Sequence, residues 1–315
     1  MKALTVTIPD DDLFERLQGA ARTWGSDVEL IQWDMQAPLP SELAAQVDVV
    51  VIGHYWNGKF DWGLLKDLPN LKMVQLPSAG YEHALPHLPP GVVLCNGRGV
   101  HSAETAELAV GLILAMQRGI AAARDNQHLG QWVFTHYQSL ADRRVLVVGA
   151  GSVGTAVVSR LKPFEVTITL VSRNEDLLPD GTIVHPVSQL PNLALDAEIM
   201  VIAVPLNEET YHLIDDKILS ALPDDALVVN VSRGDVIDQQ ALLQHLVAGR
   251  LRAALDVTSP EPLPADNPLW TAPNVLITPH QGGNTDAGYP RFATLVESQI
   301  NNILTSEVLE NVVRD

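Results

Sequence analysis

Short runs of β-branched and other apolar residues alternate with segments of helical patterning from the N-terminus to Cys95. The apolar runs predict strands at Lys2–Ile8, Val28–Trp33, Val47–Ile52, Lys72–Leu76 and Val92–Cys95. The segments between them predict helices at Asp11–Trp24 and Ser41–Gln46. Strands and helices in alternation indicate βαβ units, in which helices cover both faces of a parallel sheet.

A second series of strands and helices begins near Arg144. Strands are predicted at Arg144–Val148, Val166–Val171, Ile199–Val204, Leu227–Val231, Ala253–Val257 and Val275–Thr278. Helices are predicted near Val153–Leu161, Ile214–Leu222 and Gln239–Ala248, with a long apolar helix before the series at Ala103–Arg118 and a final one at Arg291–Leu304. Such repeated alternation is the pattern of a doubly wound nucleotide-binding domain.

Glycine-containing joins flank this second series, at Gly97 and Gly99 before it and at Gly282 and Gly283 after it. With 315 residues, the chain exceeds the ~250–300 residues at which single cores stop growing. The two joins therefore predict a substrate domain built from both chain ends, residues 1–98 with 284–315. A dinucleotide-binding domain of residues 99–283 is inserted into it.

The chain is strongly acidic, with 38 Asp and Glu against 20 Lys and Arg and a formal charge of −18. No basic run is present, so a nucleic-acid partner is not expected. Thr105–Met116 is too short for the ~20 residues of a membrane span. A single cysteine, Cys95, and an N-terminus without signal-peptide character predict a cytoplasmic protein. An anionic ligand would need locally positive groups.

The strand Val145–Val148 leads directly into Gly149-Ala150-Gly151-Ser152-Val153-Gly154 and then into a helix. A G-x-G-x-x-G turn between strand and helix is typical of dinucleotide binding. Gly149 allows the tight turn, Gly151 lets the backbone approach a pyrophosphate, and Gly154 allows helix and strand to pack closely. We therefore predict cofactor contacts from Gly149, Gly151, Ser152, Val153 and Gly154, with a plain glycine-rich turn as the alternative.

Discrimination between the two nicotinamide cofactors is read at the end of the second strand of such a domain. That place holds Ser172 and Arg173, with no acid before Glu175. A hydroxyl and a guanidinium favour a 2′-phosphate, which predicts NADP in preference to NAD. The alternative is that Arg173 is solvated and both cofactors bind. Further cofactor contacts are predicted at the ends of later strands, from Val204, Pro205, Val231 and Ser232.

Three polar motifs follow the last strands of the series. They are Asn230–Gly234, Asp256–Pro262 and Thr278–Gly283, and they supply Arg233, Glu261 and His280. This set suits hydride transfer to a 2-keto acid, because an arginine binds a carboxylate, a histidine donates a proton and a carboxylate keeps the histidine charged.

Taken singly, each of these residues has a simpler interpretation. Arg233 could lie in a surface loop, Glu261 could be a solvated carboxylate, and His280 could be a core or capping histidine. Asp238 is interpreted as the N-cap of the helix that follows it.

These motifs, in this order, resemble the D-isomer-specific 2-hydroxyacid dehydrogenases over nearly the whole chain, from Leu71–Gly80 to Asn311–Val313. The resemblance implies that Arg233 binds the carboxylate and carbonyl of the substrate, and that His280, paired with Glu261, is the acid/base. It also implies that Asp256 contacts the nicotinamide carboxamide. The backbone amides of Ser78, Ala79 and Gly80 are then expected to bind the substrate carboxylate.

The expected fold is α/β, with a Rossmann cofactor domain inserted into a flavodoxin-like substrate domain. The expected activity is NADPH-dependent reduction of glyoxylate, hydroxypyruvate or a related 2-keto acid to the D-2-hydroxy acid. The family forms dimers through the regions matching Ala103–Arg118 and the loop around Trp132, so a homodimer is expected. The family's domains close over the substrate, and the pocket is expected around His54–Asn57 and Ser78–Tyr81.

Two other functions are weighed against this activity. A formate- or phosphite-type dehydrogenase would share the fold, but formate enzymes pair the histidine with glutamine, and Glu261 argues against them. A dinucleotide-sensing corepressor would keep the same motifs. A metal site is not expected, because Pro86 interrupts the spacing of His83 and His87.

Other chemically suggestive residues are given structural interpretations. Cys95 is interpreted as a buried thiol, and Ser232 lacks the setting of a hydrolase nucleophile. Tyr55 and Trp56 are interpreted as packing residues near the mouth of the substrate site.

Overall fold

The computed structural model describes residues 2–54 and 60–314. The chain divides into two compact units. The terminal unit comprises Met1–His101 and Asp286–Asp315, and the central unit comprises Ser102–Thr285. The chain thus passes between the units at 101–102 and 285–286, where the sequence predicted passages at 98–99 and 283–284. Tyr55, Trp56 and Asn57 lie outside the described residues.

In the terminal unit the strands form one sheet in the order β14-β5-β4-β3-β1-β2. The strands are β1 (Leu4–Ile8), β2 (Val28–Gln32), β3 (Val49–Val51), β4 (Met73–Gln75), β5 (Val93–Cys95) and β14 (Val312–Arg314). Strands β1 to β5 are parallel in the flavodoxin-like order 2-1-3-4-5. Strand β14 pairs antiparallel with β5 and was not predicted.

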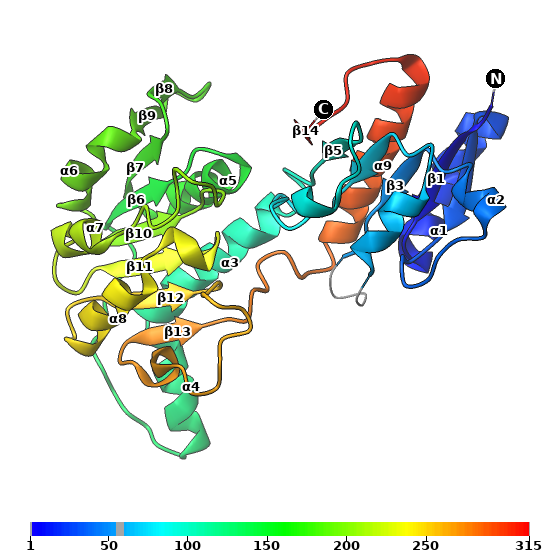
Figure 1. The fold of residues 1–315 in the computed structure, drawn as a ribbon. Helices are drawn as coiled ribbons and strands as arrows, with labels where there is room; N and C mark the ends of the chain where they lie inside the picture. The colour runs from blue at the N-terminus through cyan, green and yellow to red at the C-terminus, as the bar shows by residue number, and fades with distance from the viewer. Residues whose placement is uncertain (1, 55–59, 315) are drawn as a thin grey trace. The chain divides into compact units, whose positions relative to one another are not determined.

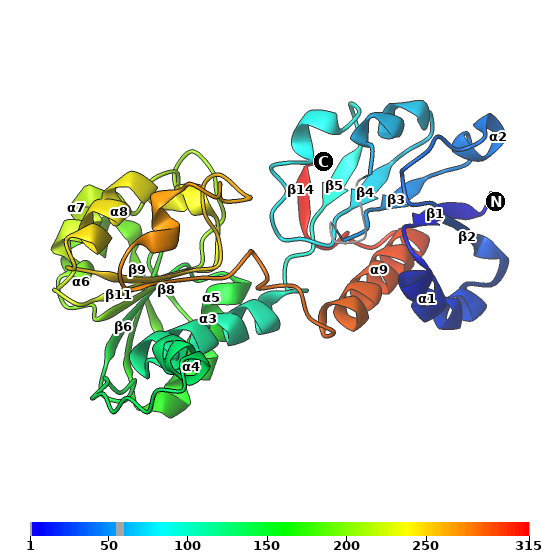
Figure 2. The ribbon, with the colours of Figure 1, turned by 90° about the horizontal axis from the view of Figure 1, so that it is seen from below.

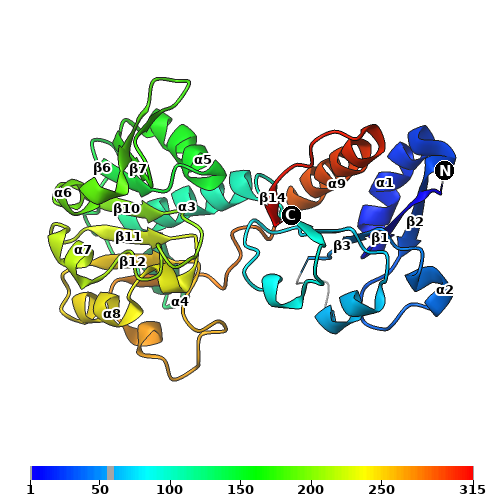
Figure 3. The ribbon, with the colours of Figure 1, turned by 45° about the horizontal axis from the view of Figure 1, so that its top comes forward.

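Helices α1 (Asp11–Trp24) and α9 (Gly288–Thr305) lie side by side on one face of this sheet (Figures 1, 2 and 3). Their shared core contains Phe292, which is fully buried. Asp10 ends the loop before α1 and caps it, because its side chain accepts the Leu13 N–H at 2.9 Å. The short helix α2 (Ser41–Ala44) and several 3₁₀ turns enclose a second core on the other face.

In the central unit the strands form one sheet in the order β13-β12-β11-β10-β6-β7-β9-β8 (Figure 1). Their bounds are β6 (Arg144–Val148), β7 (Thr167–Ser172), β8 (Asp176–Leu177), β9 (Ile183–Pro186), β10 (Ile199–Ile202), β11 (Leu227–Asn230), β12 (Arg252–Leu255) and β13 (Val275–Ile277). All pair in parallel except β8, which forms a hairpin with β9. The direction of strand order reverses between β6 and β10, where Val148 pairs with Ile202. This is the Rossmann arrangement.

Two apolar cores cover the two faces of the central sheet, and Figure 2 shows helices on both of these faces. Helices α3 (Ser102–Gln117) and α5 (Ser152–Leu161) enclose one of them. Helices α6 (Leu190–Ala194), α7 (Asp216–Ala221) and α8 (Gln239–Val247) enclose the other. Because both faces are covered, every residue of β10 is fully buried, as expected for a parallel sheet.

Helix α4 (Ile120–His128) follows α3 and contains no buried residue. It was not predicted, because a helix without a buried face leaves no apolar periodicity in the sequence. Among the described residues no single helix is long and apolar enough to cross a bilayer, although α3 and α4, bent by 65° at their junction, meet that criterion as a pair. Most of the apolar residues of α3 lie in the core against α5 and the sheet.

Candidate active site

The residues expected to bind cofactor and to catalyse all follow strands of the central sheet. Since these strands are parallel, their carboxyl ends lie at one edge of the sheet, where doubly wound domains bind their ligands. Segments at this edge are 149–154 after β6, 172–173 at the end of β7, 204–205 after β10, 231–233 after β11, 256–261 after β12 and 278–280 after β13.

The glycines of the 149–154 turn occupy the conformations and close contacts inferred from their spacing. Gly149 has φ +118°, and a Cβ there would lie 2.3 Å from the carbonyl oxygen of Ala203. A Cβ on Gly154 would lie 1.7 Å from the carbonyl oxygen of Gly149, so this glycine packs helix α5 against the turn. A Cβ on Gly151, the N-cap of α5, would meet nothing within 4 Å. The turn is therefore closed on its protein side and open at Gly151, as a pyrophosphate requires.

At the end of β7, Arg173 pairs with Glu209 of the loop after β10. Its Nε lies 3.0 Å from Oε2 of Glu209, and both side chains are about two-thirds exposed. The hydroxyl of Ser172 donates to the carbonyl of Asn174 at 2.9 Å. The guanidinium expected to recognise a 2′-phosphate is thus held by an exposed carboxylate.

Glu261 and His280 are joined by a short hydrogen bond. Oε2 of Glu261 lies 2.6 Å from Nδ1 of His280, and Oε1 accepts the backbone N–H of Thr258 at 3.1 Å. Burial raises the pKa of Glu261, but the hydrogen bond and charge of His280, the Thr258 N–H and the charge of Arg233 together lower it below the ordinary value. Glu261 is therefore an ionised carboxylate at neutral pH.

The turn that carries His280 is held by Asp256, which is 2% exposed. The carboxylate of Asp256 accepts hydrogen bonds from the Thr278 hydroxyl at 2.5 Å and from the backbone N–H groups of Gln281 at 3.0 Å and Gly282 at 2.9 Å. The backbone of His280 lies in the left-handed region, with φ +49°, which is uncommon for a residue other than glycine. Asp256 thus holds an unusual backbone conformation at His280, and its contact with a nicotinamide stays a prediction.

Arg233 lies at the end of a loop organised by Asn230, which is 1% exposed. The amide of Asn230 donates to the carbonyl of Arg233 at 2.9 Å and accepts from the N–H and hydroxyl of Ser232 at 3.0 and 2.8 Å. Nη1 of Arg233 donates to the carbonyl of Ser232 at 2.8 Å. Sequence reasoning assigned Ser232 to the cofactor and gave Asn230 no role. In the structure their side chains bond to each other and fix the loop.

Gly234 brings the arginine loop against the loop of Glu261. A Cβ at this position would lie 2.1 Å from the backbone of Thr258, so only glycine allows the approach. Since the charge of Arg233 also acts on Glu261, the structure brings together the three residues predicted to catalyse.

In the terminal unit, the Ser78-Ala79-Gly80 turn follows β4. The three carbonyl oxygens of this turn accept hydrogen bonds from Gly97 N–H at 2.7 Å, the Asn96 amide at 2.7 Å and the Ser78 hydroxyl at 2.7 Å. Within the described part of the chain, the N–H groups of Ala79 and Gly80 have no acceptor. These two N–H groups are therefore available as donors, and their binding of the substrate carboxylate stays a prediction.

Asp238 and Cys95, which the sequence did not assign to catalysis, have structural roles. Asp238 caps α8, since its side chain accepts the Ala241 N–H at 3.0 Å, which confirms the interpretation. Cys95 is fully buried, as interpreted, and burial raises the pKa of its thiol to about 11. It is unsuited to nucleophilic chemistry at neutral pH.

The histidine pair considered for a metal packs against an aromatic ring. The rings of His83 and His87 lie 5.8 and 5.7 Å from that of Trp62. Across residues 2–54 and 60–314, no group of three His, Cys, Asp or Glu side chains could hold a metal ion.

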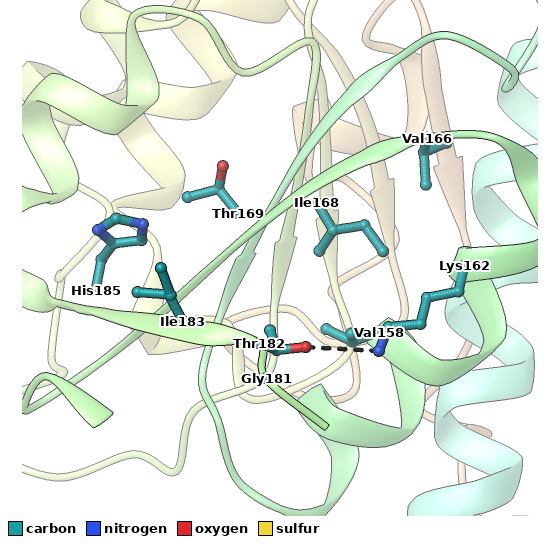
Figure 4. Close-up of a pocket in the computed structure, with 9 residues that line it drawn as sticks. All are labelled: Val158, Lys162, Val166, Ile168, Thr169, Gly181, Thr182, Ile183 and His185. Atoms are coloured by element: carbon teal, nitrogen blue, oxygen red, sulfur yellow. Dashed lines mark hydrogen bonds between the residues drawn. The ribbon is translucent and has the colours of Figure 1, made fainter. Parts of the chain in front are cut away.

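A surface hollow lies elsewhere on the central unit, between the C-terminal end of α5 and strands β7 and β9 (Figure 4). Lys162 borders it and pairs with Asp180. Much of its lining comes from the beginnings of β7 and β9, including Val166, Ile168 and Ile183, rather than from the carboxyl edge. The hollow is therefore distinct from the arrangement around Glu261 and His280.

The chain is similar to a family model and to several known proteins. The model of the NAD binding domain of D-isomer specific 2-hydroxyacid dehydrogenases matches residues 110–282. D-3-phosphoglycerate dehydrogenase of Methanocaldococcus jannaschii is 35% identical over 230 residues, which are 71% of this chain and 43% of that protein. Glyoxylate reductase/hydroxypyruvate reductase of Mus musculus is 31% identical over 303 residues, or 90% of each chain.

Among solved structures, the chain is similar to a D-isomer specific 2-hydroxyacid dehydrogenase from Xanthobacter autotrophicus Py2 in complex with NADPH and MES. The two share 28% sequence identity with a TM-score of 0.83, over 100% of this chain and 98% of that one. The similarity therefore covers both units.

Proposed function

Because the chain belongs to the D-isomer specific 2-hydroxyacid dehydrogenase family, we propose that it transfers a hydride between NADP(H) and a 2-keto acid. The substrate class is glyoxylate, hydroxypyruvate or a related 2-keto acid, and the product is the D-2-hydroxy acid. The observation that carries this proposal is the Glu261–His280 hydrogen bond, with the charge of Arg233 acting on the same carboxylate.

The open turn at Gly151 fits a dinucleotide, and we assign the pyrophosphate to the N-terminus of α5. The bound nicotinamide supplies or takes the hydride. The neighbouring residues Ser152, Val153, Val204, Pro205 and Val231 are proposed to line the rest of the cofactor site.

The chemistry assigned to this chain's own residues is binding and proton transfer. Nδ1 of His280 faces Glu261, which leaves Nε2 as the nitrogen that donates a proton to the substrate oxygen. Arg233 binds the carboxylate and carbonyl through its planar guanidinium. We expect the N–H groups of Ala79 and Gly80 to bind the same carboxylate.

The preference for NADP over NAD rests on Ser172 and Arg173. The end of β7 carries Ser172 and Arg173 instead of an acidic residue, and within the described residues Arg173 forms an exposed ion pair with Glu209. Exposed pairs contribute at most about 1 kcal/mol, so a 2′-phosphate can replace Glu209 as the partner of Arg173. The relative solved with NADPH agrees with this assignment.

A homodimer is proposed from the exposed apolar segment 129–137. Trp132 is 100% exposed and Phe134 is 92% exposed, with Leu129 and Val133 also exposed beside them. Apolar side chains gathered in this way are typical of a protein interface. Analytical ultracentrifugation of the wild type and of a Trp132→Ser, Phe134→Ser double variant tests the dimer.

A cytoplasmic location is also proposed, because the cofactor is an intracellular nucleotide.

The deciding experiment for the function is NADPH oxidation measured with glyoxylate, hydroxypyruvate, pyruvate, phenylpyruvate and branched 2-keto acids. Turnover of one of these substrates with formation of the D-2-hydroxy acid is expected. The reverse assay with formate or phosphite and NADP⁺ tests the alternative dehydrogenases. Cofactor binding without turnover of any substrate would favour a dinucleotide sensor.

A further inference from the structure

The side chain of Gln239 makes two complementary hydrogen bonds with the backbone of Ser259. Nε2 donates to the Ser259 carbonyl at 2.7 Å, and Oε1 accepts the Ser259 N–H at 2.9 Å. Gln239 is the first residue of α8 and follows the capping residue Asp238. The amide therefore projects from a fixed helix end onto the backbone of one residue of a neighbouring loop, and binds the peptide groups on both sides of Ser259.

That loop carries the carboxylate proposed to pair with the reactive histidine. Ser259 stands between Thr258, whose N–H binds Oε1 of Glu261, and Glu261 itself, whose Oε2 binds His280. The peptide between Thr258 and Ser259 also packs closely against Gly234, where a Cβ would lie 2.1 Å from the carbonyl of Thr258. The loop is thus held at Thr258 by close packing and at Ser259 by Gln239.

We infer that Gln239 is a positioning residue for proton transfer, which holds the Ser259 peptide so that Glu261 meets His280 in the catalytic geometry. The inference rests on the proposed function. Gln239 touches none of the reacting groups and acts through the loop alone. Its amide is suited to this because it presents one donor and one acceptor to a residue whose backbone offers the reverse pair.

The test replaces Gln239 by methionine, which keeps the length of the side chain and removes both hydrogen bonds. Gln240→Met is the matched control, because Gln240 is the next residue of the same helix and is exposed. Misplacement of a catalytic group by about 1 Å costs up to ~100-fold in rate. We expect kcat of Gln239→Met to fall ~10- to 100-fold, with the KM for NADPH unchanged and with Gln240→Met equal to wild type.

A second measurement does not depend on turnover. The Glu261 carboxyl, labelled with ¹³C and assigned by comparison with Glu261→Gln, is titrated by NMR in both proteins. A weakened contact with His280 moves the pKa of Glu261 upward in Gln239→Met, because the interactions that lower it are lost while burial stays. If Gln239→Met does not fold, Gln239→Ala removes the same bonds and is expected to change in the same direction.

Unchanged kcat and an unchanged Glu261 titration in a folded Gln239 variant would overturn the inference while the proposed function stands. If the wild type turned over no 2-keto acid, the proposed function would fail. The NMR titration would then decide the role of Gln239 alone.

Discussion

Nδ1 of His280 lies 2.6 Å from Oε2 of Glu261, and each side chain is only about one-third exposed. Because Glu261 is ionised and faces one ring nitrogen, it fixes the orientation of the imidazole and stabilises its protonated form. In the proposed reaction, the proton for the substrate comes from the other nitrogen. This relationship makes the pH dependence of the enzyme a property of two residues on separate loops.

Replacing Glu261 by glutamine is expected to shift the pH profile of keto-acid reduction downward. A carboxylate stabilises the imidazolium and an amide does not. As the pH rises, the variant therefore loses its proton donor at a lower pH than the wild type does. The measurement is kcat/KM against pH with NADPH saturating. His280→Ala, the reference for losing the acid itself, should cost roughly 10²- to 10⁴-fold at every pH. A Glu261→Gln profile that coincides with wild type would contradict the pairing.

Replacing Arg233 by lysine tests whether substrate binding depends on the planar guanidinium or only on its positive charge. Lysine keeps the positive charge but cannot make the bidentate contact of a planar guanidinium. Losing one hydrogen bond to a charged group costs roughly 1.5–3 kcal/mol, or about 10- to 150-fold in kcat/KM. Steady-state kinetics with the best keto acid gives the value. Near-normal turnover of Arg233→Lys would contradict the assignment of bidentate substrate binding to Arg233.

Glu209 and Arg173 together provide a test of cofactor preference. Removing the charge in Glu209→Gln frees the guanidinium, so the KM for NADPH should fall by about two- to five-fold, the scale of an exposed ion pair. The KM for NADH should not change. Arg173→Ala should raise the KM for NADPH selectively. A wild type that prefers NADH would refute the assignment of Arg173.

Many elements of the fold could be predicted from the sequence because burial leaves a pattern. The wholly buried residues of β10 form one continuous apolar run. Helix α4 buries nothing, and β8 consists of two exposed residues, so neither leaves such a pattern. Strand β14 depends on the pairing of Val312 with Cys95, which no local window of sequence contains.

In the site, too, only the residues that belong to a local sequence pattern could be predicted. The identities of Arg233, Glu261 and His280 could be predicted because motifs place them after strands. The supporting residues could not, because the bonds of Asn230 and Gln239 to neighbouring backbone exist only once the loops are folded. A glutamine at a helix start and an asparagine at a strand end have no distinctive spacing in a sequence.

Alanine substitutions at Gly151 and Gly154 of the 149–154 turn should have different effects, the first on cofactor binding and the second on stability. Gly151 has open space where a Cβ would stand and φ −74°, so Gly151→Ala should fold normally and raise the KM for NADPH. Gly154→Ala places a Cβ 1.7 Å from the Gly149 carbonyl oxygen. Overpacking of this kind costs about 1–3 kcal/mol, which thermal unfolding measures. Equal Tm values for the two variants would contradict the assigned roles.

The ionised carboxylate of Asp48 is expected to stabilise the terminal unit in a way that depends on pH. Its carboxylate is buried, accepts the Thr5 N–H at 3.1 Å and pairs with Lys72 at 2.9 Å. Burial raises the pKa of Asp48, but these partners and Lys2 lower it below 3.8 overall. A carboxyl whose folded pKa is depressed stabilises the fold above its unfolded pKa and loses that effect as the pH falls through the folded value. Asp48→Asn should therefore lower the free energy of unfolding at pH 7 by about 1–3 kcal/mol.

The difference between Asp48→Asn and wild type should shrink as the pH falls below 3.8, the ordinary value of the carboxyl. Urea unfolding of both proteins at pH 7, 5 and 3 measures it. Asp12→Asn is the control, because Asp12 pairs with Arg16 at an exposed site and its removal should cost at most about 1 kcal/mol. A destabilisation by Asp48→Asn that is the same at pH 7 and pH 3 would show that the ionisation of Asp48 contributes nothing to the stability.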